Sequence, residues 1–158
     1  MPRIVREAEI DWVGTTARGS GVVRAASTGS FELPSTIAAR VDVTWAARTE
    51  DHEGLTSPEE LLAAAHATCF VTSLGSELAR VGTPPERMYV HCTITMDEVS
   101  GAGHRIVASD IAARAVVPGA DADSLAAAAR AADEGCPFSA LIRATATVTV
   151  DATLEGGS

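Results

Sequence analysis

Three cysteines offer the most distinctive chemistry in this 158-residue chain: Cys69, Cys92 and Cys136. A thiolate is a nucleophile that can be oxidised to a sulfenic acid or a disulfide. Each cysteine also has a plain alternative, because free cysteine often packs in a core as a small apolar residue. Packing is the favoured interpretation for Cys92, which alternates with apolar residues of an expected strand. Cys136 lies at a Gly-Cys-Pro bend that can leave its sulfur accessible.

Cys69 lies within a strongly predicted helix over residues 57–81. Ser57 is a good N-cap, Pro58 suits the first helical position, and Glu60 completes a Ser-x-x-Glu capping box. The run after it is apolar on most faces, so we expect this helix to be buried.

The other elements follow from hydrophobic periodicity and turn residues. We expect strands within 1–48, two long strands over 86–117, an Ala-rich helix over 121–135, and a second-cysteine segment with a last strand over 136–155. This order lacks the regular alternation of strand and helix found in doubly wound sheets. The sequence therefore predicts the α+β class.

Composition predicts one domain, residues 1–158, with a thin core. Thirty residues are Ala, and only 34 are Val, Leu, Ile or Phe. Small side chains bury little area each, so we expect a second subunit to contribute to stability. All 12 basic residues are Arg, and the net charge is −9. That balance argues against nucleic acid as a partner.

Several common site types have no sequence support. There is no phosphate-binding glycine loop, no Cys-x-x-Cys and no Gly-x-Ser-x-Gly. We see no signal peptide and no apolar segment of about 18 residues, and so expect a cytoplasmic protein without a membrane partner. Its cysteines would then be reduced at rest. No cofactor or metal is assigned.

Two segments carry a family resemblance. Residues 57–70 read Ser-Pro-Glu-Glu-Leu-Leu-Ala-Ala-Ala-His-Ala-Thr-Cys-Phe, and residues 135–141 read Gly-Cys-Pro-Phe-Ser-Ala-Leu. They resemble the first- and second-cysteine segments of the osmotically inducible protein C / organic hydroperoxide resistance (OsmC/Ohr) family. Trp12-x-Gly14, Gly19-x-Gly21 and Val117-Pro118-Gly119 add to the likeness. His66, where the Ohr branch usually has Tyr, points to the OsmC branch.

The resemblance implies an intertwined homodimer, with antiparallel sheets wrapped around central helices. It also implies a thiol-dependent peroxidase that reduces organic hydroperoxides to alcohols. Cys69 matches the peroxidatic cysteine, which becomes a sulfenic acid, and Cys136 matches the resolving cysteine, which forms a disulfide with it. An external dithiol, from a lipoyl or thioredoxin-like protein, would restore the pair.

The resemblance assigns two charged residues to the same site. Glu59 matches the family's glutamate at the start of the helix. Arg48, three residues after Trp45, fits the active-site arginine, and Arg40 is the alternative. A guanidinium favours a thiolate, and a carboxylate can hold the guanidinium in place. Without the resemblance, a surface ion pair and helix-dipole matching explain these two charges.

Spacing adds a constraint on Glu59. It precedes Cys69 by ten residues, which is about 15 Å along a continuous helix. Either Arg48 bridges part of that gap, or Glu59 serves the partner subunit's site at a dimer interface. His66 shares a helix face with Cys69 and either tunes the thiol, ligates a metal with it, or is simply packed.

A non-catalytic function is the competing hypothesis. Leu62, Phe70 and Phe138 either line a pocket for an alkyl chain or belong to the core. A stress-associated protein that binds a small apolar ligand without turnover would use such a pocket. It would need neither Cys69 nor Cys136, which favours the enzyme.

Overall fold

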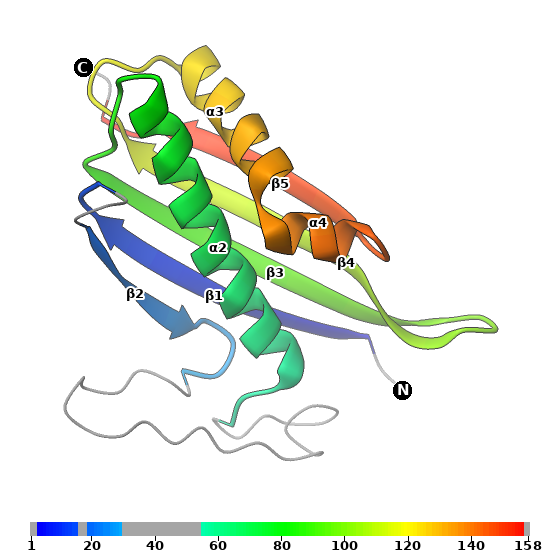
Figure 1. The fold of residues 1–158 in the computed structure, drawn as a ribbon. Coiled ribbons are helices and arrows are strands. Elements are labelled where there is room, and N and C mark those ends of the chain that lie inside the picture. The colour runs from blue at the N-terminus through cyan, green and yellow to red at the C-terminus, as the bar shows by residue number, and fades with distance from the viewer. Residues whose placement is uncertain (1–2, 16–18, 30–54, 157–158) are drawn as a thin grey trace.

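The computed structural model describes residues 3–15, 19–29 and 55–156. In this part of the chain, one five-stranded sheet carries helices over one face (Figure 1). Its strand order is β2-β1-β3-β4-β5. The strands are β1 (Ile4–Val13), β2 (Ser20–Ala25), β3 (Arg87–Val99), β4 (Gly103–Val116) and β5 (Thr147–Leu154), and the helices are α2 (Pro58–Arg80), α3 (Ala122–Gly135) and α4 (Pro137–Arg143).

The α+β class is confirmed, with one difference in strand direction. β1, β2, β3 and β4 pair antiparallel, whereas β5 runs parallel to β4. The cause is the connection, because α3 and α4 cross over the sheet and bring the chain back to the end where β4 began (Figure 1). The purely antiparallel arrangement that we expected is therefore wrong for this edge.

The start of α2 is fixed by buried polar contacts. The Ser57 side chain accepts a hydrogen bond from the Glu60 backbone N–H at 3.3 Å. The Glu60 carboxylate is fully buried and accepts from the Thr28 backbone N–H at 2.9 Å and from the Thr56 hydroxyl at 2.6 Å. Glu60 therefore ties the turn after β2 to the helix instead of closing the expected capping box.

The core lies between α2 and the sheet. Side chains from one face of α2, including Ala67, Phe70 and Leu74, pack against Val90 and Ile94 of β3. The expectation that α2 is buried on most faces is wrong for the single chain. Its opposite face holds partly or largely exposed residues, namely Leu61, Ala64, Ala65, Thr68 and Cys69.

The length of α2 corrects another expectation. Its 23 residues are long and apolar enough to cross a membrane by length and composition alone, although we expected no such segment. The core helix of a soluble protein passes the same test. The apolar face of α2 packs on the sheet of its own chain, which is the behaviour of a core helix.

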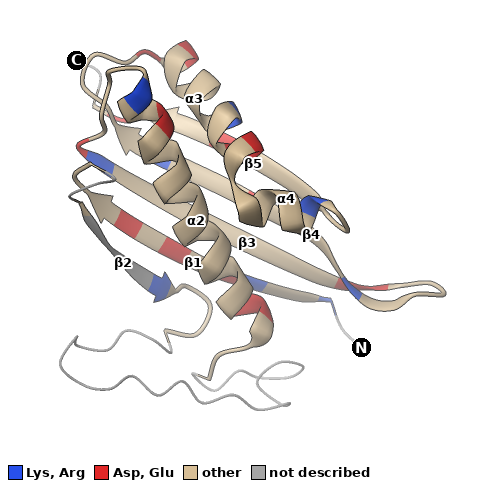
Figure 2. Cartoon of the chain, in the orientation of Figure 1, with Lys and Arg blue, Asp and Glu red and all other residues tan. Residues whose placement is uncertain are grey.

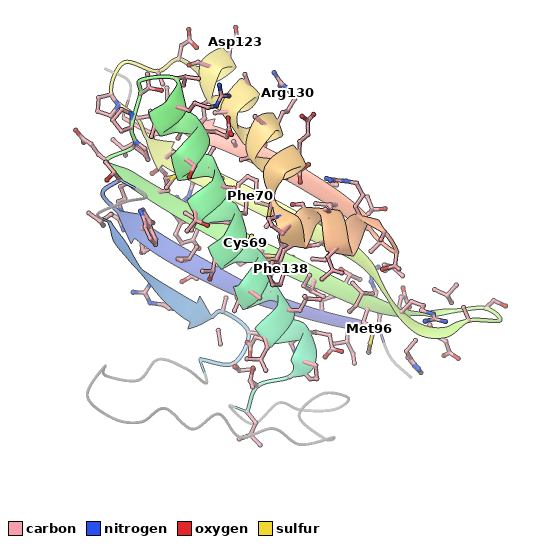
Figure 3. The ribbon with its side chains drawn as sticks, viewed as in Figure 1. Cys69, Phe70, Met96, Asp123, Arg130 and Phe138 are labelled. Carbon is pink, nitrogen blue, oxygen red and sulfur yellow. The ribbon has the colours of Figure 1, made fainter. Side chains whose placement is uncertain are left out.

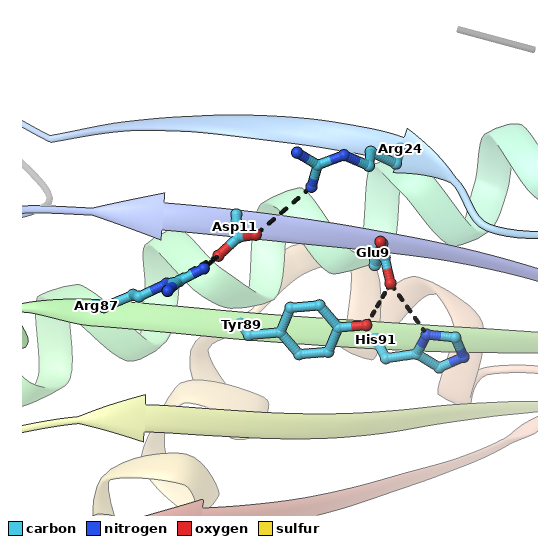
Figure 4. Close-up of polar contacts among 6 residues, drawn as sticks. All are labelled: Glu9, Asp11, Arg24, Arg87, Tyr89 and His91. Atoms are coloured by element: carbon cyan, nitrogen blue, oxygen red, sulfur yellow. Dashed lines mark hydrogen bonds and ion pairs between the residues drawn. The ribbon is translucent and has the colours of Figure 1, made fainter. Parts of the chain in front are cut away.

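The other face of the sheet is polar. Asp11 on β1 contacts Arg24 at 3.5 Å and Arg87 at 2.6 Å, while Glu9 contacts Tyr89 and His91 (Figure 4). Acidic residues lie along β1 and at both ends of α2 (Figure 2). A buried active site would therefore lie on the face of the sheet that the helices cover.

Candidate active site

Cys69 and Cys136 meet where α2 passes the junction of α3 and α4. Their Sγ atoms are 3.3 Å apart, although the residues are 67 positions apart in the chain. Cys136 is fully buried, whereas Cys69 is partly exposed and lies beside Phe138 of α4 (Figure 3). A disulfide needs an approach to about 2.05 Å, so a small movement joins the two sulfurs.

Local sequence explains the position of Cys136. It is both the last cap of α3 and the N-cap of α4, with extended backbone at φ −77° and ψ 117°. Pro137 has no N–H to continue α3, and its fixed φ suits the first residue of α4. The resulting bend points the thiol inward toward α2.

The surroundings of Cys136 favour its thiolate. Burial is the largest single influence and raises its pKa. Hydrogen bonds from His66, from the Ser139 backbone N–H, from Cys69 and from the Ser139 hydroxyl together outweigh burial and lower the pKa of Cys136 to about 6. At neutral pH the buried sulfur of the pair is therefore ionised.

The pKa of Cys69 is shifted in the opposite direction, upward. Burial and the neighbouring Cys136 raise the pKa of Cys69, and a hydrogen bond from the Phe138 backbone N–H offsets this only in part. The described residues therefore do not produce the Cys69 thiolate that peroxide chemistry needs. Arg48 and the alternative Arg40, which we expect to supply the guanidinium, lie outside the described residues.

Glu59 lies at the start of α2 and is 2% exposed. The helix is continuous from Pro58 to Arg80, so the axial separation of about 15 Å between Glu59 and Cys69 applies. The structure therefore does not bring Glu59 to the sulfur pair of its own chain.

Sequence reasoning missed two serines at the site. Ser109 on β4 and Ser139 on α4 are fully buried, and both contact the ring of His66. A signal existed for Ser109, because it is a polar residue at a position that alternation with Ile111 and Ala113 turns toward the core. Ser139 follows Cys136 by three residues, which places the two in the same short turn.

The apolar residues that we expected to line a pocket divide into two groups. Phe70 is fully buried in the core cluster, so it does not line an open pocket. Leu62 and Phe138 are partly exposed. Leu62 borders a groove of about 270 Å³ together with Met96 and Ile106. Phe138 is the apolar side chain that lies beside the Cys69 thiol (Figure 3).

No metal site emerges from the described ranges. Within them, no group of three or more His, Cys, Asp or Glu residues is placed to hold a metal ion. Both ring nitrogens of His66 contact serine hydroxyls, at 2.8 and 2.9 Å.

Cys92 serves as an internal reference for reactivity. It is fully buried on β3, and burial is the main cause that raises its pKa to about 12. Because the thiolate is the reactive form, we expect Cys92 to resist alkylation in the folded protein. Iodoacetamide treatment at neutral pH, read by peptide mass spectrometry, should label Cys69, whose side chain is partly exposed, and leave the fully buried Cys92 unmodified until denaturant is added. Equal labelling of both in the folded state would contradict this.

Comparison with known proteins identifies the family. Residues 50–151 match the family model described as OsmC-like protein. The chain is 30% identical to peroxiredoxin OsmC of Escherichia coli (strain K12) over an alignment of 145 residues. This alignment covers 92% of this chain and 94% of that protein.

The chain belongs to the OsmC family.

Solved structures show the same fold. The organic hydroperoxide resistance protein OhrB of Bacillus subtilis aligns with a TM-score of 0.59 at 20% identity, over 94% of this chain and 97% of that one. An OsmC-like protein from Mycoplasma pneumoniae aligns with a TM-score of 0.60 at 12% identity, over 68% of this chain and 78% of that one. The OsmC match includes Glu59, Cys69 and Cys136, while Arg48 and Arg40 precede it.

Proposed function

We propose that this OsmC-family protein is a thiol-dependent peroxidase that reduces organic hydroperoxides to alcohols. The observation that best supports this proposal is the pair of cysteine sulfurs. The Sγ atom of the partly exposed Cys69 lies 3.3 Å from the Sγ atom of the buried Cys136. The names of its relatives, a peroxiredoxin and an organic hydroperoxide resistance protein, support a redox role that involves peroxides.

The cycle has two oxidative steps and one reductive step. The Cys69 thiolate attacks the peroxide oxygen, releases the alcohol and becomes a sulfenic acid. Cys136 then attacks the Cys69 sulfur, forming the disulfide and releasing water. An external dithiol, from a lipoyl or thioredoxin-like protein, reduces the disulfide to two thiols. The partial exposure of Cys69 suits it for the first step, and the burial of Cys136 suits it for the second.

Arg48 and Glu59 complete the proposed site. The guanidinium of Arg48 would favour the Cys69 thiolate, which the described surroundings disfavour. Glu59 would hold an arginine by a bidentate pair. The separation of Glu59 from its own Cys69 supports a placement in which it serves the site of a second subunit.

A homodimer is part of this proposal. Leu61 is 42% exposed on the open face of α2, next to partly exposed Ala64 and Ala65. Small side chains permit close helix contacts, and burying this face would enlarge the thin core. We also propose a cytoplasmic location, where reducing conditions keep both cysteines ready for peroxide.

The pH dependence of disulfide closure follows from Cys136. Its thiolate is the attacking form, and its pKa is about 6. We expect the rate of closure to be constant above neutrality and to fall as pH drops through about 6, because Cys136 then gains a proton. Rapid-quench measurement of the disulfide from pH 5 to 8 tests this (roughly the range over which such a thiol titrates). A rate that keeps rising steeply above pH 7 would contradict the low pKa.

Turnover distinguishes the enzyme from a binding protein. Purified protein should consume cumene hydroperoxide or tert-butyl hydroperoxide with a dithiol reductant, and hydrogen peroxide less efficiently. The alternative, a protein that binds a small apolar ligand without turnover, predicts no consumption and equal ligand binding by wild type and Cys69→Ser. That pair of results would overturn the proposal.

A further inference from the structure

His66 connects three elements of the fold through its imidazole ring. It lies on α2 and is fully buried. Its Nδ1 is 2.8 Å from Ser109 Oγ of β4, and its Nε2 is 2.9 Å from Ser139 Oγ of α4. Both serines are also fully buried. We call this pair of contacts, from Ser109 through His66 to Ser139, the serine–histidine bridge, and it ties α4 to the sheet through α2.

Both hydrogen bonds of the bridge form whichever ring nitrogen carries the proton. A neutral imidazole donates from one nitrogen and accepts at the other, and a serine hydroxyl does either. Contacts at both nitrogens fix the orientation of the buried ring, and breaking one of them leaves a buried polar atom without its partner. The ring of His66 is therefore a rigid spacer between β4 and α4.

The bridge lies directly beside the pair of sulfurs. On α2, Cys69 follows His66 by three residues, so the two share a helix face and lie about one turn apart. On the facing segment, Cys136 precedes Ser139 by three residues at the start of α4. The hydrogen bond between His66 and Ser139 and the contact between the two sulfurs are therefore neighbouring links between the same two segments.

The short helix α4 depends on tertiary contacts for its position. It has seven residues, Pro137–Arg143, and a helix of that length is not stable by itself in water. Its buried residues are Ser139 and Ile142, of which Ile142 packs in the apolar core. Arg143 pairs with Asp133 at 2.5 Å, which ties α4 to α3. Ser139 provides a directional contact between α4 and α2, close to the sulfurs.

We propose that His66 and Ser139 are positioning residues, and that the serine–histidine bridge holds Cys136 against Cys69 for disulfide closure. This role rests on the proposed function, and it involves no proton transfer by the ring. In closure, the Cys136 thiolate attacks the Cys69 sulfenic acid, the S–S bond forms and the S–O bond breaks. The Cys69 sulfur is reduced, the Cys136 sulfur is oxidised, and the departing hydroxide takes a proton from solvent to become water. An intact bridge confines the movement to the approach of the sulfurs from 3.3 Å to about 2.05 Å.

Ser109→Ala tests the bridge from its far end. Ser109 lies on β4, and the hydrogen bonds that lower the pKa of Cys136 come from other residues. Its effect on closure therefore passes through the ring of His66. We expect disulfide closure to slow by about tenfold, because a nucleophile that is held less firmly reacts more slowly. The rate of sulfenic acid formation should not change, because Cys69 keeps its place on α2.

Closure is measured by rapid quench at about pH 9 after one equivalent of cumene hydroperoxide, with mass spectrometry of the sulfenic acid and the disulfide. At this pH even a thiol with an ordinary pKa of about 8.5 is mostly ionised, so the supply of thiolate is similar in every variant. Ser139→Ala, at the other end of the bridge, should also slow closure by about tenfold. The double variant should be no slower than the slower single variant, because each substitution breaks the same bridge.

Thr95→Val is the matched control. It removes another buried hydroxyl, on β3, and should leave closure at the wild-type rate. Wild-type closure in Ser109→Ala would overturn the positioning role, and so would separate effects that multiply to about a hundredfold loss in the double variant. If one single variant does not fold, the closure rate of the other decides. Either failure would leave hydroperoxide reduction standing, whereas a wild type that forms no sulfenic acid would overturn the proposed function and the positioning role together.

Discussion

Cys69→Ser is expected to abolish hydroperoxide reduction, with kcat/KM falling by on the order of a thousandfold or more, as for other lost nucleophiles. A serine hydroxyl is almost fully protonated at neutral pH and cannot form a sulfenic acid. Since Cys69 is partly exposed on α2, the loss should come without a large change in thermal stability. Peroxide consumption assays with a dithiol, together with a melting curve, measure both.

Cys92→Ser is the matched control for this result. It removes a thiol that is fully buried and has its pKa raised to about 12, which places it outside the proposed chemistry. We expect it to retain turnover at the wild-type level, although a small loss of stability is expected from a polar hydroxyl in the core. Cys69→Ser with more than a tenth of wild-type activity would show that the peroxide reacts elsewhere.

Cys136→Ser is expected to give one reduction event and then stop. The Cys69 sulfenic acid still forms, but its resolving partner at 3.3 Å is gone. Without closure, Cys69 remains open to further oxidation to the sulfinic acid, which dithiols do not reverse. We therefore expect steady-state turnover with a dithiol to fall by about 100-fold, and overoxidised Cys69 to appear within a few equivalents of peroxide.

The test compares the initial burst of hydroperoxide consumption with the steady-state rate of turnover. Cys136→Ser should consume about one equivalent of hydroperoxide per subunit in a burst, at a rate that reports on Cys69 alone. Unchanged multi-turnover activity would mean that an external thiol resolves the sulfenic acid directly, and that Cys136 is not required.

Local signals predicted much of the fold. Ser57 and Pro58 mark the observed start of α2, and the alternation of β3 correctly separates Val90 and Cys92 from Tyr89. The parallel pairing of β5 was not predictable in this way, since strand direction depends on how α3 and α4 cross over the sheet. The sequence around β5 is equally compatible with either direction.

The residues of the candidate site could be predicted from the family resemblance, but not from the spacing of residues in the sequence. Nothing local indicates that Cys69 and Cys136 approach each other, because they are 67 positions apart, with two strands and helix α3 between them. The contacts of His66 depend on Ser109 and Ser139, which are 43 and 73 positions away. Such contacts arise only when α2 packs on the sheet, and periodicity within one element carries no information about them.

The burial of individual side chains in the structure also changed the roles that we assign to them. Phe70 looked like a possible pocket residue, but the 3.6-residue period of α2 turns it onto the sheet with Leu74. Leu61, on the same helix, faces outward. Which face of an apolar helix is covered depends on what packs there, and a second subunit is our proposed answer for the open face.

Mass spectrometry of the oxidised protein tests the central claim most directly. Reduced protein is mixed with one equivalent of cumene hydroperoxide, alkylated under denaturing conditions and digested without reductant. We expect a peptide pair joined through Cys69 and Cys136, with Cys92 recovered in alkylated form. A disulfide that includes Cys92, or three alkylated cysteines after the peroxide has been consumed, would contradict it.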